Sequence, residues 1–321
     1  MTTYFAGSGV DAFYLSPTQP FMENGRINVN YGKWMDGYIL DPQTNRPAVG
    51  LQSLWTHFGC DSDSSDYNNG RPFVVWSASD GQEVVRLVGA GNGSMYLQYR
   101  SDAQWVSLPV QSGIMGSWKC DVRIDLHPTQ GRLQFYANQQ FMGEWTGLAM
   151  SAPTLDLSKV RFSSQGDRYY AYYDQVIMAS YNTIGHTVRT RRPRSEGASS
   201  AWAGTFGDVN EDGLNDSTAL NTETVGARTT FVADQLSETT PGNVIKAVTV
   251  AARIRNSDEG TPRNARAIVR VSGTDYVFPK DMQIAPGFVG AATTFDVNPA
   301  TGLRWASVSE LNGEFGLLAT E

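Results

Sequence analysis

The sequence predicts an all-β protein built from two antiparallel domains, and three observations lead to this prediction. The chain has 321 residues, which is above the size at which one hydrophobic core usually divides. Charged residues make up only 18% of it, while it contains 32 Gly, 14 Tyr, 14 Phe and 8 Trp, a composition typical of sheets joined by turns. Apolar and polar residues alternate in many short segments, and no segment shows a long helical period.

The clearest strand is the segment WKCDVRIDL, residues 118–126. Its alternation is complete over nine residues, which predicts a half-buried antiparallel strand with Cys120 as a small core residue. The apolar face holds Trp118, Cys120, Val122, Ile124 and Leu126, and the polar face holds Lys119, Asp121, Arg123 and Asp125.

Strand and turn patterns surround this segment. RLQFYANQQFMGEW, residues 132–145, predicts a hairpin that turns at NQQ. EVVRLV, MYLQYR and WVSLPV predict three strands with turns between them, within residues 83–110. KVRFSS and YYAYYDQVIMASY predict two more strands before residue 182.

The second half of the chain also contains segments in which apolar and polar residues alternate. In NARAIVRVSG, residues 264–273, every second residue is small or branched, and Arg266 and Arg270 lie on the opposite face. VIKAVTVAARIR, residues 244–255, also alternates, apart from an interruption at Lys246. Both segments predict strands of a second domain.

A polar segment, TVRTRRPRSEGASS at residues 187–200, interrupts the strand pattern with a proline and a glycine. We therefore predict a first domain at residues 1–188, a linker at 189–200 and a second domain at 201–321. Four arginines of this segment fit either a phosphate-binding patch or a solvated linker. They are Arg189, Arg191, Arg192 and Arg194.

The charge balance favours the solvated linker. The formal net charge is −7 and the pI is about 5.1, which argues against nucleic acid as a partner. The chain begins without a basic region followed by an apolar one, so we expect no secretory signal. No uncharged apolar run approaches the roughly 18 residues of a membrane span, and we expect no membrane insertion.

A family resemblance enters at SWKCDVRIDLHPTQGRLQFYANQQFMGEW, residues 117–145. This strand, glycine-containing turn and returning strand resemble the hairpin of concanavalin-A-like, or laminin-G-like, sandwich domains. The resemblance implies a jelly-roll sandwich of the lectin and glucanase type for residues 1–188. We expect the second domain to be a smaller β-sandwich.

A second resemblance covers most of the chain. YYDQVIMASYNTIGHTV, WAGTFGDVNE and NPATGLRWASVSELNGEFGLLA are similar to segments of tailed-bacteriophage structural proteins, which pair a lectin-like sandwich with a shorter C-terminal β-domain. The last segment carries the matching pattern at Pro299, Thr301, Gly302, Trp305, Phe315 and Gly316. This resemblance implies a virion component and brings no active site with it.

Catalytic patterns receive little support from the sequence. Glucanases share the sandwich fold, and the best local carboxylate pair here is Asp121 and Asp125. Four residues at about 3.3 Å each separate them by about 13 Å, whereas glycosidase pairs lie about 5 to 9.5 Å apart. A cross-strand charge ladder is the better interpretation, although carboxylates from separate strands keep a polysaccharide hydrolase open as an alternative.

Metal and thiol chemistry was considered at the segment WTHFGC. His57 and Cys60 form only half of a structural zinc site, because no second close pair of ligands exists in the sequence. The cysteines Cys60 and Cys120 are expected to stay reduced in a protein made in a cytoplasm.

Tyrosines and acidic residues give the two candidate binding sites. DRYYAYYDQ places Tyr170 and Tyr172 on one strand face and Tyr169 and Tyr173 on the other, which fits core packing, a subunit contact or sugar binding. GDVNEDGLNDST opens like a calcium loop, but position 12 is Ala219, so a full EF-hand loop is excluded. A shorter calcium site and an ordinary turn both remain open. The calcium ligands would be Asp208, Asn210, Asp212 and Asp216.

From the sequence we expect a non-enzymatic bacteriophage virion protein, a fibre, appendage or decoration protein on the tail or capsid. Its expected partners are other virion proteins and copies of itself, and no cofactor other than calcium is expected. It would be made in the host cytoplasm and located in the virion. A host-surface glycan-binding adhesin is the first alternative, and a polysaccharide hydrolase is the second.

Overall fold

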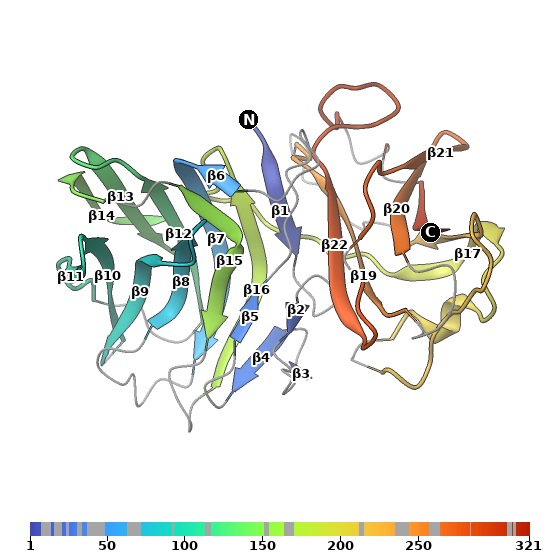
Figure 1. Ribbon diagram of the computed structural model, residues 1–321, viewed down its shortest axis with the longest axis horizontal. Helices are drawn as coiled ribbons and strands as arrows, with labels where there is room; N and C mark the ends of the chain where they lie inside the picture. The colour runs from blue at the N-terminus through green and yellow to red at the C-terminus, as the bar shows by residue number, and fades with distance from the viewer. Residues whose placement is uncertain are drawn as a thin grey trace.

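The computed structural model shows two β-rich bodies side by side, the first formed by β1 to β16 and the second by β17 to β23 (Figure 1). All strand pairs in the described part of the chain are antiparallel, as the sequence predicts. No helix within it has the length and apolarity to cross a bilayer. The structure describes residues 1–7, 14–15, 21–23, 26–30, 34–36, 49–62, 72–91, 93–112, 117–150, 154–163, 170–211, 215–234, 244–256, 264–282, 284–306, 310 and 313–321.

The first body is a sandwich of two eight-stranded sheets. In one of them, called here the β12 sheet, the strands are ordered β14-β13-β12-β7-β16-β4-β3, and β1 pairs with β16. Its strands are β1 (Thr3–Gly7), β3 (Phe21–Glu23), β4 (Arg26–Asn30), β7 (Ser53–Ser62), β12 (Ser117–Asp125), β13 (Gly131–Ala137), β14 (Gln140–Leu148) and β16 (Tyr170–Ala179).

The opposing sheet, called here the β9 sheet, has the order β11-β10-β9-β8-β15-β5-β2, and β6 pairs with β15. Its strands are β2 (Tyr14–Leu15), β5 (Trp34–Asp36), β6 (Val49–Leu51), β8 (Pro72–Ala78), β9 (Glu83–Gly91), β10 (Ser94–Ser101), β11 (Gln104–Ser107) and β15 (Leu155–Ser163).

Aromatic side chains fill the space between these two sheets. Phe58 of β7 meets Trp118 of β12 and Phe162 of β15 edge to face, with ring centroids 5.9 and 5.5 Å apart. The indole of Trp76 donates a hydrogen bond to Oγ1 of Thr56 at 2.9 Å, so its one polar atom is satisfied inside the core. The predicted sandwich is confirmed, although β8 and part of β7 are buried on both faces.

The two cysteines lie on the inner face of the β12 sheet. Cys60 and Cys120 are both buried and are not joined by a disulfide. Burial, together with the neighbouring Cys60 and Asp121, raises the pKa of the Cys120 thiol well above its usual value. Cys120 is therefore a core residue with little thiolate character.

The hairpin predicted at NQQ is confirmed. Asn138 and Gln139 connect β13 to β14 and both have positive φ, at 50° and 66°. A two-residue turn with positive φ at both positions matches the right-handed twist of the strands that it joins.

The second body packs a five-stranded sheet, ordered β17-β18-β23-β20-β21, against the pair β19-β22. Trp305 is 1% exposed in its core, and the indole donates to the carbonyl of Phe295 at 2.9 Å. Its strands are β17 (Pro193–Ser200), β18 (Arg228–Ala233), β19 (Val248–Ile254), β20 (Asn264–Val271), β21 (Thr274–Val277), β22 (Val289–Phe295) and β23 (Glu314–Thr320), and a 3-10 turn η2 covers Phe206–Asp208.

The linker predicted at residues 189–200 is shorter than expected, because its second part forms strand β17. This strand pairs with β18 at the edge of the five-stranded sheet. Its side chains alternate between half-buried and exposed, and proline is tolerated at the first position of an edge strand. Polar composition concealed this strand, because an edge strand needs few apolar residues.

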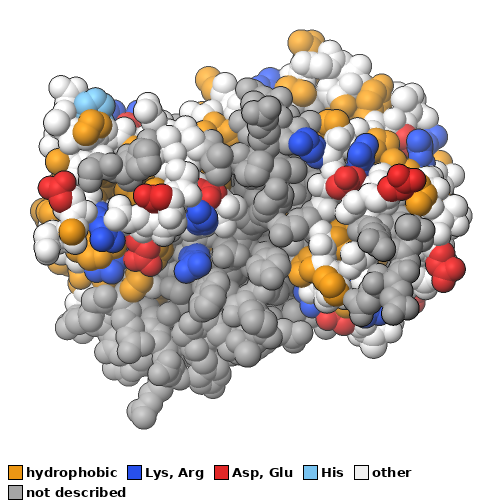
Figure 2. Space-filling model, in the orientation of Figure 1, with side chains coloured by type: hydrophobic (Ala, Val, Ile, Leu, Met, Phe, Trp, Pro, Cys, Tyr) orange, Lys and Arg blue, Asp and Glu red, His pale blue; other side chains and the backbone are white. Residues whose placement is uncertain are grey.

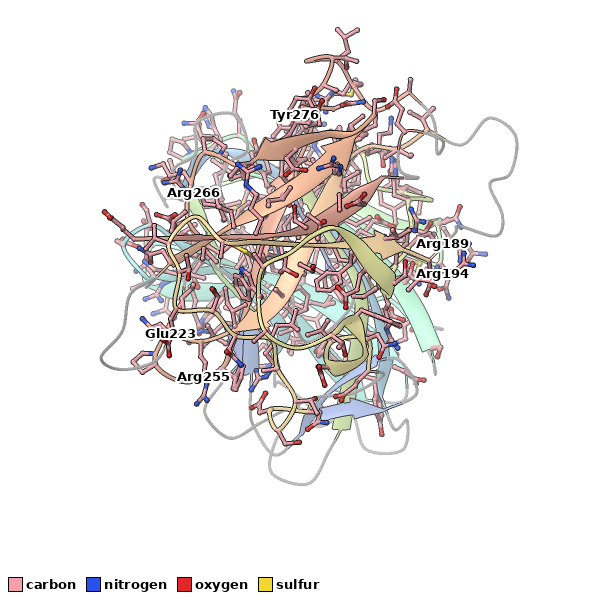
Figure 3. The ribbon with its side chains drawn as sticks, turned by 90° about the vertical axis from the view of Figure 1, so that its right-hand side faces the viewer. Arg189, Arg194, Glu223, Arg255, Arg266 and Tyr276 are labelled. Carbon is pink, nitrogen blue, oxygen red and sulfur yellow. The ribbon has the colours of Figure 1, made fainter. Side chains whose placement is uncertain are left out.

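The arginines of this segment have different surroundings. Arg191 donates to the carbonyl oxygens of Ala233 and Asp234, and burial lowers the pKa of its guanidinium. Arg189 and Arg194 are exposed and lie at one edge of the second body (Figure 3). Acidic and basic side chains are interspersed on the face drawn in Figure 2. Arg191 is therefore held by carbonyl groups of the protein, and the solvated-linker interpretation of the other arginines stays a prediction.

The two bodies meet at the N-terminal strand, which lies beside β22 (Figure 1). The backbone N–H of Thr3 donates to Oδ1 of Asp296 at 2.7 Å, and Arg304 donates to the same oxygen at 2.7 Å. The hydroxyls of Thr3 and Tyr181 are 2.6 Å apart, and burial raises the pKa of Tyr181. This joint therefore ties the first residues of the chain to a loop near its end.

Candidate functional site

The outer face of the β12 sheet presents an ordered grid of polar and aromatic side chains. Strands β7, β12, β13 and β14 are in register, so outward residues line up in rows across four strands. The first row is His57, Asp121, Tyr136 and Phe141; the second is Trp55, Arg123, Gln134 and Glu144; the third is Ser53, Asp125, Arg132 and Thr146.

Aromatic rings run diagonally over this grid. The ring centroid of Tyr136 is 6.1 Å from that of Trp55 and 5.3 Å from that of Phe141. Trp55 is 6% exposed, Tyr136 is half-buried and Phe141 is 58% exposed, so solvent exposure increases along this diagonal from Trp55 to Phe141. Of the aromatic side chains that the structure describes, Phe141 is the one in the exposed class.

A ladder of charged groups lies beside the rings. Asp125 accepts from Arg123 with Nε and Oδ2 2.9 Å apart, and it also accepts from the hydroxyl of Ser53 at 2.5 Å. Nε of Arg132 is 3.7 Å from Oδ2 of Asp125 and 3.5 Å from Oε1 of Glu144. The predicted cross-strand ladder is confirmed for Asp125, and its charges balance one another.

The ladder keeps hydrogen-bonding capacity at its outer edge. Gln134 donates to Oε1 of Glu144 at 3.0 Å. Among the described residues, nothing donates to Oε2 of Glu144 or to Oε1 of Gln134. These two oxygens are acceptors that neighbouring charges hold in place.

The first row ends in a buried polar cluster rather than in solvent. Nδ1 of His57 is 2.8 Å from Oδ1 of Asp121, and the hydroxyl of Thr183 donates to that oxygen at 2.7 Å. His57 and Asp121 are 1% and 0% exposed. The ladder interpretation is therefore wrong for Asp121, because the segment between β16 and β17 covers this end of the face.

This burial also decides two chemical questions raised by the sequence. Asp121 cannot act with Asp125 on a bound polysaccharide, because its carboxylate is closed off by Thr183. His57 points to Asp121 on the outer face, whereas Cys60 belongs to the core, so the two do not form half of a metal site. No group of three metal-ligating side chains occurs in the described ranges.

The predicted tyrosine cluster divides between the two strand faces. Tyr173 is 0% exposed, and its hydroxyl donates to the carbonyl of Phe73 at 3.0 Å, so it packs in the core. Tyr172 is half-buried on the opposite face. Tyr169 and the side chain of Tyr170 lie outside the described residues. A ligand or interface role for this cluster stays a prediction.

The predicted calcium ligands are in part held by protein partners. Both carboxylate oxygens of Asp216 accept from Arg253, at 2.7 and 2.8 Å, and this hydrogen-bonded pairing lowers the pKa of Asp216. Oδ2 of Asp208 accepts from the backbone N–H of Thr205 at 2.7 Å. Asn210 is exposed, and Asp212 lies outside the described residues. Calcium binding at this loop stays a prediction.

Sequence reasoning missed the aromatic part of the face. Tyr136 and Phe141 occur inside the hairpin that the sequence predicted, and the alternation already placed Tyr136 opposite the core residue Phe135. The two-residue turn places Phe141 opposite Tyr136. The missing information was the long-range pairing of β7 with β12, which brings Trp55 close to Tyr136.

Comparison with known proteins gives a likeness to solved structures alone: no protein-family model matches, and no curated protein matches. The cellulose-induced protein Cip1 is 12% identical, with a TM-score of 0.37 over 54% of this chain and 93% of that one. The carbohydrate recognition domain of Emp47p is 11% identical, with a TM-score of 0.38 over 55% of this chain and 98% of that one.

A third similar structure extends over both bodies. The binding domain of botulinum neurotoxin DC, solved with rat synaptotagmin II, is 9% identical, with a TM-score of 0.39 over 99% of this chain and 95% of that one. Values this low carry no information about ligand or activity. The virion role stays a prediction.

Proposed function

We propose that this protein binds neutral carbohydrate chains, without cleaving them, on the outer face of the β12 sheet. The observation that carries this proposal is the diagonal of rings from Trp55 through Tyr136 to the exposed Phe141 beside fixed polar groups. Sugar sites combine an apolar aromatic surface with a few polar groups of fixed position.

Each part of the face has a role in such binding. The apolar C–H surface of a pyranose ring packs on Phe141, and a neighbouring sugar reaches Tyr136, whose ring centroid is 5.3 Å away. Sugar hydroxyls donate to the acceptor oxygens of Gln134 and Glu144. Because Asp125 and Glu144 are already paired with arginines, the described ladder has no uncompensated charge that a ligand must neutralise. This favours neutral chains.

Native-gel electrophoresis in gels containing mixed-linkage β-glucan, galactomannan or xylan tests the proposal. We expect at least one of these polysaccharides to retard the protein and Phe141→Ala to abolish most of that retardation. Val106→Ala is the matched control, since Val106 is an exposed apolar residue on β11 in the opposite sheet. Absence of retardation in all three gels overturns the proposal.

A reducing-end assay on the same polysaccharides separates binding from hydrolysis. We expect no new reducing ends after prolonged incubation. Release of reducing ends that Glu144→Gln abolishes would replace the binding proposal with the hydrolase alternative.

The resemblance to tailed-phage structural proteins supplies the setting for this proposal. On a virion, many copies would each bind host-surface glycan weakly, and their effective concentration would give strong attachment. Immunogold electron microscopy of purified particles, with antibody against this chain, tests the setting. We expect label on the tail or capsid, and unlabelled particles that also lack the chain by mass spectrometry would contradict it.

A further inference from the structure

The outer face of the opposite sheet carries a different cluster, on strands β9, β10 and β11. Arg86, Gln98 and Ser107 are directly opposite one another in register across the three strands. Two residues further along these strands, and on the same face, Arg100 is opposite Trp105. The cluster therefore occupies the edge of the β9 sheet, on the side of the sandwich that faces away from the aromatic diagonal.

Hydrogen bonds hold Arg86 in a fixed position. Its Nε–H donates to Oε1 of Gln98, and Nε2 of Gln98 donates to the hydroxyl oxygen of Ser107 at 2.8 Å. Gln98 is 8% exposed, which makes it a buried support rather than a mobile surface group. The guanidinium carbon of Arg86 lies 4.0 Å from the ring centroid of Trp105, at cation–π distance.

The hydrogen bond to Gln98 uses Nε of Arg86 and leaves the two terminal nitrogens of the guanidinium for other partners. No carboxylate of the described residues forms an ion pair with it, and neither terminal nitrogen has a hydrogen-bond partner among them. Burial lowers the pKa of the guanidinium, and the nearby carboxylate of Glu83 opposes this shift only in part. An arginine with both terminal nitrogens available matches the two oxygens of a carboxylate.

We propose that Arg86, Trp105, Gln98 and Ser107 form a second binding site, which takes a carboxylate-bearing sugar of an acidic glycan. The terminal nitrogens of Arg86 bind the carboxylate in two parallel hydrogen bonds. The hydroxyl of Ser107 accepts from Gln98 and keeps its own proton for a ligand oxygen. The site is independent of the proposed site on the β12 sheet.

A sugar fits this cluster better than the carboxylate of a peptide. Trp105 lies on the edge strand β11 and supplies an apolar ring directly beside the charged group. In an acidic sugar the carboxylate is attached to a ring with an apolar C–H surface. One rigid sugar residue can therefore contact both Arg86 and Trp105. Ser107, being exposed, adds a hydroxyl suited to the ring substituents.

Isothermal titration of the full chain tests this site with two carboxylated probes, trigalacturonate and sialyllactose. The methyl ester of trigalacturonate is the matched neutral ligand. We expect at least one carboxylated probe to bind, the ester to bind at least about tenfold more weakly, and Arg86→Gln to cause a similar loss. Arg100→Gln on the same strand face is the control variant and retains binding.

Further arms separate this site from the other proposals. Phe141→Ala retains binding of the acidic probe if the site is independent; its loss would assign the probe to the β12 sheet and overturn the site. Equal binding of the peptide acetyl-Gly-Ala, with its free carboxylate, would overturn the choice of a glycan. Failure of both carboxylated probes to bind, with an unchanged melting temperature in Arg86→Gln, overturns the proposal as a whole.

Discussion

The two outer faces of the first sandwich differ in how their charged side chains are paired. On the β12 sheet, Asp125 is shared by Arg123 and Arg132, so the charges of the ladder are balanced within the protein. On the β9 sheet, Arg86 is supported by an uncharged amide and an indole, and no described carboxylate forms an ion pair with it. A balanced surface suits a neutral ligand, and an unbalanced one suits an anion.

The outer face of the β12 sheet has one end that serves the fold and another end that is open to solvent. At its covered end, Asp121 serves the protein alone, since His57 and Thr183 use its carboxylate under a loop. At its open end, Phe141 is 58% exposed and belongs to neither hydrophobic core. The same strands thus carry a structural anchor and a surface available to a ligand.

The largest effect is expected from Asp121→Ala. The substitution leaves the buried His57 and Thr183 without their acceptor, and we expect the free energy of unfolding to fall by about 3 kcal/mol. Urea denaturation followed by fluorescence measures it. Asp125→Ala, on the exposed ladder, is the control and costs less than about 1 kcal/mol. Equal losses for the two variants would show that the two ends of the face do not differ.

The second largest effect is expected on glycan affinity, with no change in stability. Phe141→Ala should weaken the neutral-glycan interaction about tenfold, equivalent to about 1.4 kcal/mol, while the melting temperature stays within about 1 °C of the parent protein. The reason is that its ring is largely solvent-exposed and contacts chiefly Tyr136. Titration with the retarding polysaccharide and thermal unfolding are the two measurements. A large fall in melting temperature without a binding loss would make Phe141 a structural residue.

Salt concentration should affect ligand binding differently at the two faces. Raising NaCl from 50 mM to 1 M should weaken binding of the acidic probe severalfold, because counterions screen the exposed side of Arg86. Binding of the neutral polysaccharide should change less than twofold. Titration at both salt concentrations checks this, and equal salt sensitivity would contradict the assignment of different charge preferences to the two faces.

The smallest effect is expected from Arg132→Gln. Its ion pairs are long, at 3.5 and 3.7 Å, and its side chain is 39% exposed. We expect a loss of about 0.5 kcal/mol in unfolding free energy at low salt, and no difference from the parent in 1 M NaCl. Urea denaturation at the two salt concentrations measures both values. A loss that persists in high salt would mean that packing rather than charge explains this residue.

Strand identity was readable from the sequence where one face is apolar. WKCDVRIDL and NARAIVRVSG form β12 and β20 with the predicted residues inward, and Asp121 and Ile268 on the opposite faces are buried as well. β17 was missed, because an edge strand with two partly exposed faces has no apolar alternation to detect. The same limit applies to the two proposed ligand sites, whose polar and aromatic residues carry no period of their own.

By itself the sequence determined the all-β class, the tight turn at Asn138 and Gln139, and the inward face of most strands, because these depend on residues close together in the chain. Only the tertiary structure decided which outward residues meet. Trp55 and Tyr136 belong to strands far apart in sequence, and Asp121 is buried by Thr183, 62 residues later. Arg86 and Trp105 likewise meet through the register of three strands. Pairing and register place these side chains, and both are set by packing across the whole fold.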